Sequence, residues 1–511
     1  MQTFAAVDIG SNSCRLKIAR VVRQQLKVLH EDREVTRLGA SVFESGLISP
    51  AAMSDTLQAL KRFYRSVQSF GVDKVRAVAT SAMRDARNAR AFLAWIQDET
   101  GWNVEIISGL EEGRLIHRGV MSNEPGTAGR CLLIDLGGGS CELSLSVSRR
   151  IKETISLPLG AVRLTADFLR SDPPSAEDIA RLKQFIAREM RRAERKLHGV
   201  RVPLVIATSG TAAALSDAAR AIRKPSAKKA PAETLTALRE VRRLATKLTK
   251  MSNVERAAIP GIGPRRSEII IAGTQVYAEL MERFSLPAFR YSPLGLRDGI
   301  LAQMLAELDA PTTAHQQFAS ERWEGVLETC RRYGVDPRQA EPVRQHAVQL
   351  FHDLQRVHEL PAEYQDWLEA AAMLRDIGKF MNYQGHHRHA QYIIANSELF
   401  GFTPQQRAVT SAIARYLGKS RPEPAGRTMK QVPPEEHEHV RRAVVLLRLA
   451  VALNQDRASD VLRVNARTYP KRVLLELNPG RTGAELELWS LRKEADYFRE
   501  VFRRDLLVTL V

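Results

Sequence analysis

The chain has 511 residues, of which 44% are hydrophobic and 26% are charged, as is ordinary for a globular protein. At roughly 100–200 residues a domain, this length predicts three or four domains. The 76 Lys and Arg residues outnumber the 58 Asp and Glu residues, so the net charge is +18. Such a surplus indicates either an anionic partner (nucleic acid, an anionic membrane surface or a phosphate polymer) or only a solvated basic surface.

Cysteine content and hydropathy exclude two classes of protein. Four cysteines in a chain of this length do not make a disulfide scaffold, and no CxxC pair suggests zinc. The first residues, MQTFAAVDIG, enter a strand without a signal peptide. The longest apolar stretch, Val444–Leu453, is too short for a bilayer and contains Arg448. We therefore expect a cytoplasmic protein that does not span a membrane.

The first elements in chain order predict an α/β domain. An apolar strand, Phe4–Asp8, ends in DIGS and opens a β-meander, and Ser49 with Pro50 is typical of a helix start. The elements that follow are strands at Leu16–Val22 and Leu26–Leu29, a helix at Ser49–Phe70, a strand at Lys74–Thr80, a helix at Phe92–Thr100, a strand at Val104–Ser108 and a helix from Glu111.

The same plan then restarts. A second apolar strand, Cys131–Asp135, ends in DLGGGS and is again followed by two strands, Glu142–Val147 and Ile151–Ser156. The segments VDIGSNSCRLKI and IDLGGGSCELSL align with Asp8 and Asp135 127 residues apart. A repeat at this spacing predicts that one α/β domain is duplicated, with a cleft between the two copies.

Each DxG turn predicts a phosphate site. A strand that ends in a tight glycine turn points several backbone N–H groups into one concavity, which binds phosphate oxygens. Gly137, Gly138 and Gly139 permit close approach because they carry no Cβ. Asp8 and Asp135, at the strand ends, are placed to hold Mg²⁺ directly or through water. A single turn of this kind is more often an ordinary strand-to-turn aspartate, but two copies in register favour a phosphate clamp.

Two further segments have both a structural and a functional interpretation. Thr208-Ser209-Gly210-Thr211 follows a strand and begins a helix, so it is either a simple helix cap or an anion site at a helix N-terminus. Glu111 and Glu112 begin another helix, where carboxylates complement the helix dipole. Alternatively, one of these two glutamates orients or deprotonates the water that attacks a phosphate.

Together these segments resemble the exopolyphosphatase and guanosine-pentaphosphate phosphatase (Ppx/GppA) family. The resemblance covers nearly the whole chain and implies two actin-like ATPase (ribonuclease H-like) domains. A helical HD-like domain and a small α+β cap at the C-terminus follow them. The matching stretches are AAVDIGSNSCRLKIARV, RLGASVFESGLIS, ATSAMRDARNA, VEIISGLEEGRLI, LLIDLGGGSCELSL, LPLGAVRL, ATSGTAAAL, YSPLGLRDGIL and AAMLRDIGKFMNYQGHHRHAQYIIANS.

The resemblance assigns roles to individual residues. The second glutamate of the S-G-x-E-E-x-R motif, here Glu112, is the catalytic base in this family. The carboxylates of D-x-G-G-G-S-x-E, here Asp135 and Glu142, bind Mg²⁺, and the arginine of the T-x-x-x-R turn, Arg84, contacts substrate phosphate. Another divalent ion is an alternative to Mg²⁺, and a monovalent cation is a further candidate. The residues expected to hold phosphates are Ser11, Asn12, Ser13, Gly137, Gly138, Gly139, Ser140, Ser209, Gly210 and Thr211.

Four domains are expected, with a linker at Asp309-Ala-Pro-Thr-Thr. The region from His315 to about Asp456 has an almost wholly helical pattern, and the tail alternates as strands do. The expected boundaries are 1–125 and 126–308 for the two actin-like domains, 315–455 for the helical domain and 456–511 for the cap.

The helical region also evokes the HD phosphohydrolases, which bind metal through a His-Asp pair. Here Arg375 stands before Asp376 where that histidine would be, and a guanidinium cannot ligate a metal ion. The segment also contains His386, His387 and His389. We therefore expect a domain that is kept for its architecture or that guides a polyanion, rather than a second metal site.

Three functions remain open. The first is an Mg²⁺-dependent exopolyphosphatase, and the second is a guanosine pentaphosphate (pppGpp) 5′-phosphatase that uses the same site. The third is a non-catalytic polyphosphate or nucleic-acid binder, which would require the loss of Glu112, Asp135 or Glu142. All three are present, and the basic segments lack the clustered aromatics of nucleic-acid modules. We therefore expect no specific nucleic acid and no membrane as partners, and the resemblance implies a homodimer.

Overall fold

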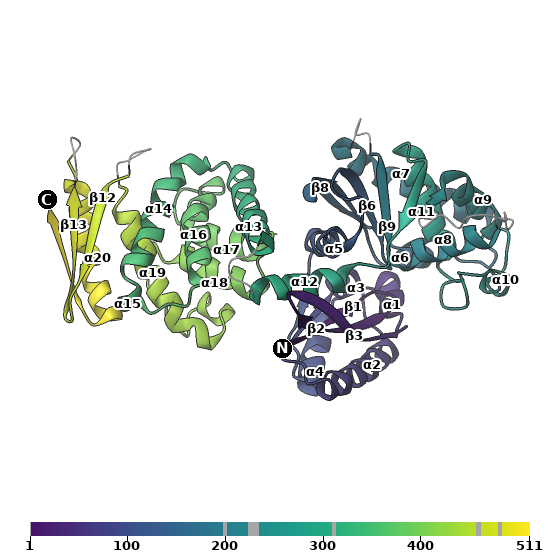
Figure 1. Cartoon of the computed structure of the whole chain (residues 1–511), viewed down its shortest axis with the longest axis horizontal. Helices are drawn as coiled ribbons and strands as arrows, with labels where there is room; N and C mark the ends of the chain where they lie inside the picture. The colour runs from purple at the N-terminus through teal and green to yellow at the C-terminus, as the bar shows by residue number, and fades with distance from the viewer. Residues whose placement is uncertain are drawn as a thin grey trace. The chain divides into compact units, whose positions relative to one another are not determined.

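The computed structural model forms two compact units, Met1–Thr312 and Thr313–Val511 (Figure 1). It describes residues 2–197, 202–222, 235–308, 313–397, 399–418, 420–455, 461–478 and 483–511, and only the backbone over 313–319. Most of the predicted linker lies outside these ranges, and the boundaries expected between the four domains stay predictions. Within the described residues, no helix is long and apolar enough to cross a membrane.

The first half of unit one, lobe I, is built on a five-stranded sheet of order β3-β2-β1-β4-β5. Its central strand β1 (Thr3–Ile9) is buried along almost its whole length, as its apolar sequence TFAAVDI predicts. β1 pairs antiparallel with β2 and parallel with β4. The other elements are β2 (Cys14–Val22), β3 (Gln25–Glu34), β4 (Lys74–Ala79), β5 (Val104–Ile106), α1 (Leu38–Ser45), α2 (Pro50–Ser69), α3 (Ser81–Asp85) and α4 (Ala89–Thr100).

The second half of unit one, lobe II, repeats this plan. Its sheet has the order β10-β11-β9-β6-β7-β8, in which β6 pairs antiparallel with β7 and parallel with β9. The meander followed by a parallel strand therefore occurs twice, which confirms the predicted duplication. The elements are β6 (Arg130–Leu136), β7 (Cys141–Val147), β8 (Arg150–Leu157), β9 (Leu204–Thr208), β10 (Leu235–Ala237), β11 (Ala288–Tyr291), α6 (Ala161–Phe168), α7 (Ala176–Leu197), α8 (Ser209–Ile222), α9 (Leu238–Leu248), α10 (Asn253–Ala257) and α11 (Ile270–Arg283).

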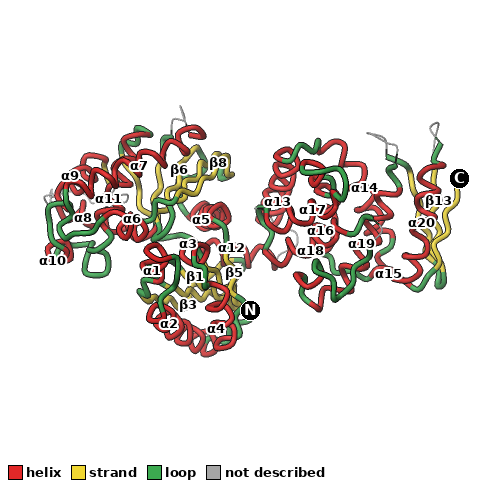
Figure 2. Tube along the Cα trace, turned by 180° about the vertical axis from the view of Figure 1, so that it is seen from behind, coloured by secondary structure: helices red, strands yellow, loops and turns green. Residues whose placement is uncertain are grey.

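Two helices, α5 (Gly109–Asn123) and α12 (Leu296–Leu308), lie between the lobes and join them (Figures 1 and 2). α12 packs on one face of the lobe I sheet, and α5 packs on one face of the lobe II sheet. They also pack on each other through glycines: a Cβ on Gly299 would lie 1.8 Å from the carbonyl oxygen of Leu115. This close crossing brings the ends of the two sheets near each other.

Gly299→Ala is expected to destabilise unit one because the added methyl group would meet backbone rather than a movable side chain. Overpacking of this kind typically costs about 1–3 kcal/mol. The measurement is the free energy of unfolding in urea. Gly295→Ala is the matched control because a Cβ there meets nothing within 4 Å. Equal stability of the two variants would contradict the tight crossing.

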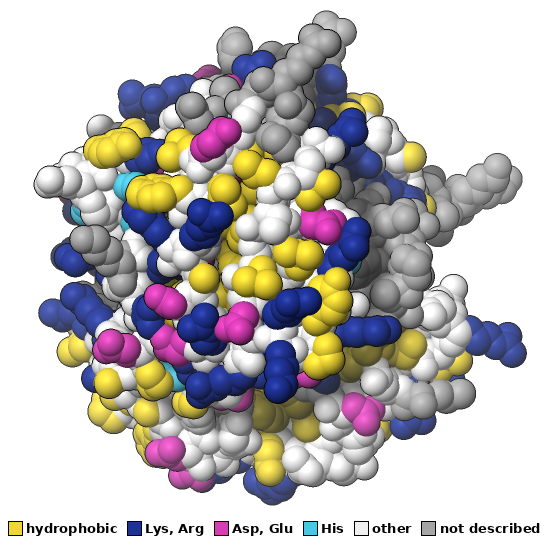
Figure 3. Space-filling view, turned by 90° about the vertical axis from the view of Figure 1, so that its left-hand side faces the viewer, with side chains coloured by type: hydrophobic (Ala, Val, Ile, Leu, Met, Phe, Trp, Pro, Cys, Tyr) yellow, Lys and Arg dark blue, Asp and Glu magenta, His cyan; other side chains and the backbone are white. Residues whose placement is uncertain are grey.

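Unit two joins a helical part to a small terminal sheet of order β12-β13-β14. One hydrophobic core runs from Val326 in α13 to Leu506 in β14, so helices and sheet pack as one body. On the face shown in Figure 3, Lys and Arg side chains are interspersed with acidic and hydrophobic ones. The elements are α13 (Thr313–Arg332), α14 (Pro337–Asp353), α15 (Gln355–His358), α16 (Tyr364–Leu374), η1 (Ile377–Phe380), α17 (His386–Asn396), α18 (Pro404–Arg415), η2 (Met429–Gln431), η3 (Pro434–Glu436), α19 (His437–Ala452), β12 (Arg463–Thr468), β13 (Arg472–Asn478), α20 (Glu485–Phe502) and β14 (Asp505–Leu510).

Candidate active site

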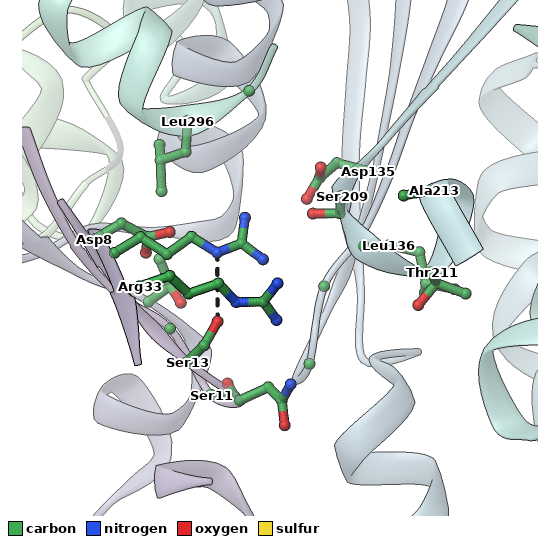
Figure 4. Close-up of a pocket in the computed structure, with 18 of the residues that line it drawn as sticks. Asp8, Ser11, Ser13, Arg33, Asp135, Leu136, Ser209, Thr211, Ala213 and Leu296 are labelled. Carbon is green, nitrogen blue, oxygen red and sulfur yellow. Dashed lines mark hydrogen bonds between the residues drawn. The ribbon is translucent and has the colours of Figure 1, made fainter. Parts of the chain in front are cut away.

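A pocket of about 690 Å³ lies between the two lobes of unit one. Both DxG turns and the first residues of α8 line it, so the two halves of the repeat meet in one cavity. In Figure 4, Asp8 and Ser13 lie on the lobe I side, and Asp135 and Ser209 face them from lobe II. Of the residues predicted to act here, the pocket lining includes Asp8, Ser11, Asn12, Ser13, Glu112, Asp135, Gly137, Gly138, Gly139, Ser140, Ser209, Gly210 and Thr211.

The glycine turn of lobe II is oriented by α6. Backbone N–H groups at the start of α6 donate to the carbonyl oxygens of Gly137 and Gly138, at 3.0 Å from Ala161 and 2.8 Å from Val162. A peptide carbonyl points opposite to the next N–H, because the peptide unit is planar and trans. The N–H groups of Gly138 and Gly139 therefore point away from α6, where a phosphate can accept their hydrogen bonds.

Lobe I holds its turn in the same way. The backbone N–H of Gly39 donates to the carbonyl of Ser11 at 2.7 Å, and that of Arg37 donates to the carbonyl of Asn12 at 3.1 Å. The turn is closed by Gly10 N–H on the carbonyl of Ser13, as Gly137 N–H closes the lobe II turn on Ser140. In both copies of the repeat, therefore, the strand ends in a turn whose carbonyl oxygens accept hydrogen bonds from backbone N–H groups.

The third turn places a strained residue beside the pocket. Ser209 has φ +68°, a left-handed conformation that is uncommon for a residue other than glycine. Thr208, just before it, donates its hydroxyl to the carboxylate of Asp135. Gly210 leaves room for a side chain, since a Cβ there would lie 1.4 Å from the Nη2 atom of Arg266. This turn therefore contacts both Asp135 and Arg266 at the pocket.

The structure distinguishes the two adjacent glutamates of α5. Glu111 accepts two hydrogen bonds from Arg114, at 2.8 and 2.6 Å, and does not line the pocket. Glu112 lines the pocket and is only 8% exposed. Its carboxylate accepts a hydrogen bond from Arg84 at 3.0 Å. The geometry therefore favours Glu112 as the carboxylate that can reach a water molecule in the pocket.

Burial gives the carboxyl groups of the site unusual protonation behaviour. It raises the pKa of Glu112 to about 7, with Arg84 opposing the rise and Asp135 and Asp8 adding to it. Burial also holds the pKa of Glu142 well above its usual range, and the charges of Glu112 and Asp135 add to this effect. The pKa values of Asp8 and Asp135 are raised by burial as well. Burial therefore disfavours the ionised forms of these carboxyl groups, and a bound cation would favour them.

Two of the predicted site residues, Arg84 and Glu142, are not part of the pocket lining. Arg84 donates to the carbonyl of Ile107 at 2.6 Å and to Glu112, so its guanidinium is held by these groups and is not part of the pocket lining. Glu142 is 2% exposed and accepts a hydrogen bond from Ser156 at 2.7 Å. Its other oxygen, Oε2, is buried without a hydrogen-bond partner. Glu142 also stands opposite Asp135 in the β6–β7 register.

The model of the Ppx/GppA phosphatase family matches residues 17–308, and the model of domain III of these phosphatases matches residues 322–495. The chain belongs to the Ppx/GppA phosphatase family. The actin-like α/β fold and the helical HD-like domain expected from the sequence are thereby confirmed.

Solved structures agree with this assignment. The chain is similar to an exopolyphosphatase from Cytophaga hutchinsonii, at 27% identity and a TM-score of 0.56, over 61% of this chain and 100% of that one. It is similar to the Aquifex aeolicus member of the Ppx/GppA family, at 30% identity and a TM-score of 0.50, over 60% and 97%. An exopolyphosphatase-like protein matches at 28% identity and a TM-score of 0.55, over 58% and 96%.

In this Ppx/GppA chain, the repeat carries opposite charges at one pair of positions. Arg15 stands opposite Asp8 in the β1–β2 register, and Glu142 stands opposite Asp135 at the equivalent place. Arg15 opposes the burial-driven rise in the pKa of Asp8, whereas its counterpart Glu142 is itself a carboxyl group. The two halves of the repeat therefore differ in charge at this one pair of positions, with a guanidinium beside Asp8 and a carboxyl group beside Asp135.

Sequence reasoning missed the cationic part of the pocket. Burial and repulsion from neighbouring arginines lower the pKa of Arg33 to about 10 and that of Arg266 to about 9. The Nε and Nη2 atoms of Arg33 are buried without a hydrogen-bond partner. Guanidinium groups held together in this way favour an anionic ligand. In the sequence, only Arg15 could have been recognised as a pocket residue, because the repeat aligns it with Glu142. The arginines that line the pocket are Arg15, Arg33, Arg265, Arg266 and Arg297.

In the HD-like segment of unit two, the carboxylate of Asp376 lies among basic side chains. Asp376 lies 2.9 Å from the ammonium of Lys379, 3.4 Å from the guanidinium of Arg375 and 3.6 Å from the ring of His386. Burial alone would raise the pKa of Asp376, but these neighbours outweigh it and lower the pKa. The carboxylate is therefore held in ion pairs of the protein itself, as expected for a segment with an arginine where a metal ligand would stand.

Proposed function

We propose that this Ppx/GppA phosphatase is an exopolyphosphatase, which releases terminal phosphate from inorganic polyphosphate. The observation that carries the proposal is the convergence in one pocket of two phosphate turns, the carboxylate of Glu112 and five guanidinium groups. A linear polyanion requires many donors and positive charges along its length. Tyr291 is the one aromatic residue among those that line the pocket, so little of the described surface there is suited to stacking on a base.

Each group has a role in the proposal. The N–H groups of the two DxG turns and of the turn before α8 would bind the terminal phosphates. The arginines of the pocket would neutralise the phosphates that follow along the chain. Glu112 would be the general base, and Arg84 would hold its carboxylate in place rather than contact the substrate. The proposed partners are this substrate and a second copy of the chain.

The carboxylates fit a divalent cation. Glu142 has a buried carboxylate oxygen without a hydrogen-bond partner, beside Asp135 in the register. Within the described residues, no group of three or more His, Cys, Asp or Glu side chains is arranged to hold a metal ion. Mg²⁺ needs only one or two carboxylates, because substrate phosphates and water complete its coordination. We propose that Asp135 and Glu142, with Asp8 on the opposite side, would hold Mg²⁺, or another divalent ion, which would offset phosphate charge.

The reaction uses few protein groups. A water oxygen attacks the terminal phosphorus, its bond to the bridging oxygen breaks, and the shortened polyphosphate leaves with that oxygen. Glu112 accepts a proton from the water and later returns it to solvent. The turn N–H groups and arginines stabilise the charge on the transferred group, which is the main requirement of phosphoryl transfer.

The raised pKa of Glu112 predicts the pH dependence of turnover. A general base acts only when it is deprotonated, so kcat/KM is expected to rise with pH and level off once Glu112 is ionised. The midpoint should lie at or below about 7, because a bound cation stabilises the carboxylate and lowers its pKa. The measurement is kcat/KM on polyphosphate from pH 5 to 9. An activity that falls as pH rises through this range would contradict the role of Glu112.

The second candidate is a pppGpp 5′-phosphatase on the same site. The pocket lining also includes the apolar residues Ile262, Leu294 and Leu296 and the aromatic residue Tyr291, which would offer contacts to a guanosine. A substrate panel separates the two functions: polyphosphates of several lengths, pppGpp and ATP, each assayed with Mg²⁺ and again with EDTA. We expect the highest kcat/KM on polyphosphate and loss of activity with EDTA. A large preference for pppGpp would reverse the order, and no phosphate release from any of them would end the proposal.

A further inference from the structure

One arginine outside the pocket lining joins the lobe II phosphate turn to lobe I. Arg163, in the first turns of α6, donates from Nε to the carbonyl oxygen of Gly139 at 2.8 Å. This is the next carbonyl after the two that the α6 backbone captures, so all three glycines of the turn bond to the same helix. The capture of Gly139 by a side chain fixes the peptide that presents the N–H of Ser140, a residue of the pocket lining.

The rest of the guanidinium is held by lobe I. Its Nη2 atom donates to the hydroxyl of Ser81 at 3.0 Å and forms an ion pair with Asp85. The guanidinium carbon lies 4.1 Å from the centre of the Phe43 ring, within the range of a cation–π contact. Arg163 thus has one polar partner in lobe II and three contacts on two helices of lobe I.

The surroundings leave the turn little freedom to move. A Cβ on Gly139 would lie 2.3 Å from Oγ of Ser81 and 2.8 Å from the Phe43 ring. Ser81 and Phe43 are therefore in contact with the turn itself as well as with Arg163. The side chain of Arg163 is 19% exposed, so it is largely shielded from water. An exposed ion pair typically contributes little, about 0–1 kcal/mol, but a planar guanidinium shared among four partners is a more rigid connection.

We propose that Arg163 is a positioning residue: it holds the lobe II phosphate turn in its binding geometry and couples that geometry to the contact of the turn with lobe I. The inference rests on the proposed function, since the turn is taken to bind the terminal phosphate. Arg163 touches neither the pocket nor a reacting atom, and it acts through the carbonyl of Gly139. Without it, the N–H of Ser140 would no longer be aimed at the phosphate, and the lobes would lose a direct connection beside the turn.

Hydrogen–deuterium exchange of the protein without substrate tests this role directly. In Arg163→Met, which keeps the apolar stem of the side chain, we expect amides of a peptide covering residues 137–141 to exchange about tenfold faster or more. Peptides from α7 should be unchanged. Arg181→Met is the matched control, because among the described residues Arg181 forms its ion pair within α7, with Asp178. Unchanged exchange over residues 137–141 in Arg163→Met would overturn the proposal.

Kinetics give a second readout. Misplacement of a binding group by about 1 Å can reduce turnover about 100-fold, so Arg163→Met should lower kcat by about 10- to 100-fold while its melting temperature stays near that of Arg181→Met. Arg163→Lys should recover only part of the loss, because one ammonium cannot reach Gly139 and Asp85 together. If Arg163→Met lowered the melting temperature together with kcat, and Arg163→Lys restored both fully, Arg163 would be only a structural charge. If the wild-type protein released no phosphate from polyphosphate, the proposed function would fail, while the exchange measurement would still decide on Arg163.

Discussion

Glu112→Gln is expected to lower kcat on polyphosphate by about 100- to 10,000-fold, the range that general acid–base catalysis supplies. Glutamine keeps the shape and the hydrogen bond to Arg84, but it cannot accept the proton of the attacking water. KM should change little, because the turns and arginines that are proposed to bind phosphate remain. The measurement is steady-state release of orthophosphate, with the acid limb of the pH profile recorded for the same variant.

Glu111→Gln is the matched control for this prediction. The two glutamates are neighbours in α5, yet Glu111 is bound to Arg114 and does not line the pocket. Its replacement should cost stability, through the weakened contact with buried Arg114, and leave kcat within a few-fold of wild type. If Glu112→Gln retained full turnover, or if Glu111→Gln lost it at unchanged stability, the base would be a different residue from the one that faces the pocket.

Gly160→Ala is expected to reduce kcat/KM by about 100-fold, because it would displace the lobe II turn. A Cβ at this position would lie 2.2–2.3 Å from three backbone atoms of Gly139, so the turn has to move. The backbone of Gly160 has φ −66°, which any residue adopts, so the effect is one of space alone. The measurement is kcat/KM on polyphosphate together with binding of tripolyphosphate by calorimetry.

Gly129→Ala is the control for that substitution. A Cβ at Gly129 meets nothing within 4 Å, and Gly129 lies outside the pocket lining. It should leave both kcat/KM and tripolyphosphate binding near wild-type values. Tight binding of tripolyphosphate by Gly160→Ala would show that the turn is not where the phosphates sit, and the proposed site would then have to lie elsewhere in the pocket.

Much of this architecture could be predicted because it depends on short segments. The apolar strand ending in an aspartate and a glycine turn specifies its own local structure, and its repetition from Asp8 to Asp135 indicates two copies of one domain. Ser49 and Pro50 likewise predict the start of α2, and Ser49 does accept the N–H of Ala52. Such features follow from hydrogen bonding and backbone conformation within a few residues.

Local pattern alone does not choose between Glu111 and Glu112, and only the family resemblance favoured Glu112. Both follow the cap residue Ser108 in the first turn of α5, and both suit a helix N-terminus equally well. The distinction arises because Arg114, which binds Glu111, also donates to Gln303 in α12, 189 residues later in the chain. Packing of α5 against α12 therefore decides which carboxylate faces the pocket.

The sequence by itself predicted the duplicated fold, the two DxG turns and, through the family resemblance, Glu112 as the base, because these depend on patterns within single segments. Only the tertiary structure decided which side chains meet. The arginines of the pocket come from β2, β3, the segment before α11 and the start of α12, and Arg163 reaches from α6 to lobe I. Charges that are far apart in the chain can be assigned to one site only when folding has brought them together.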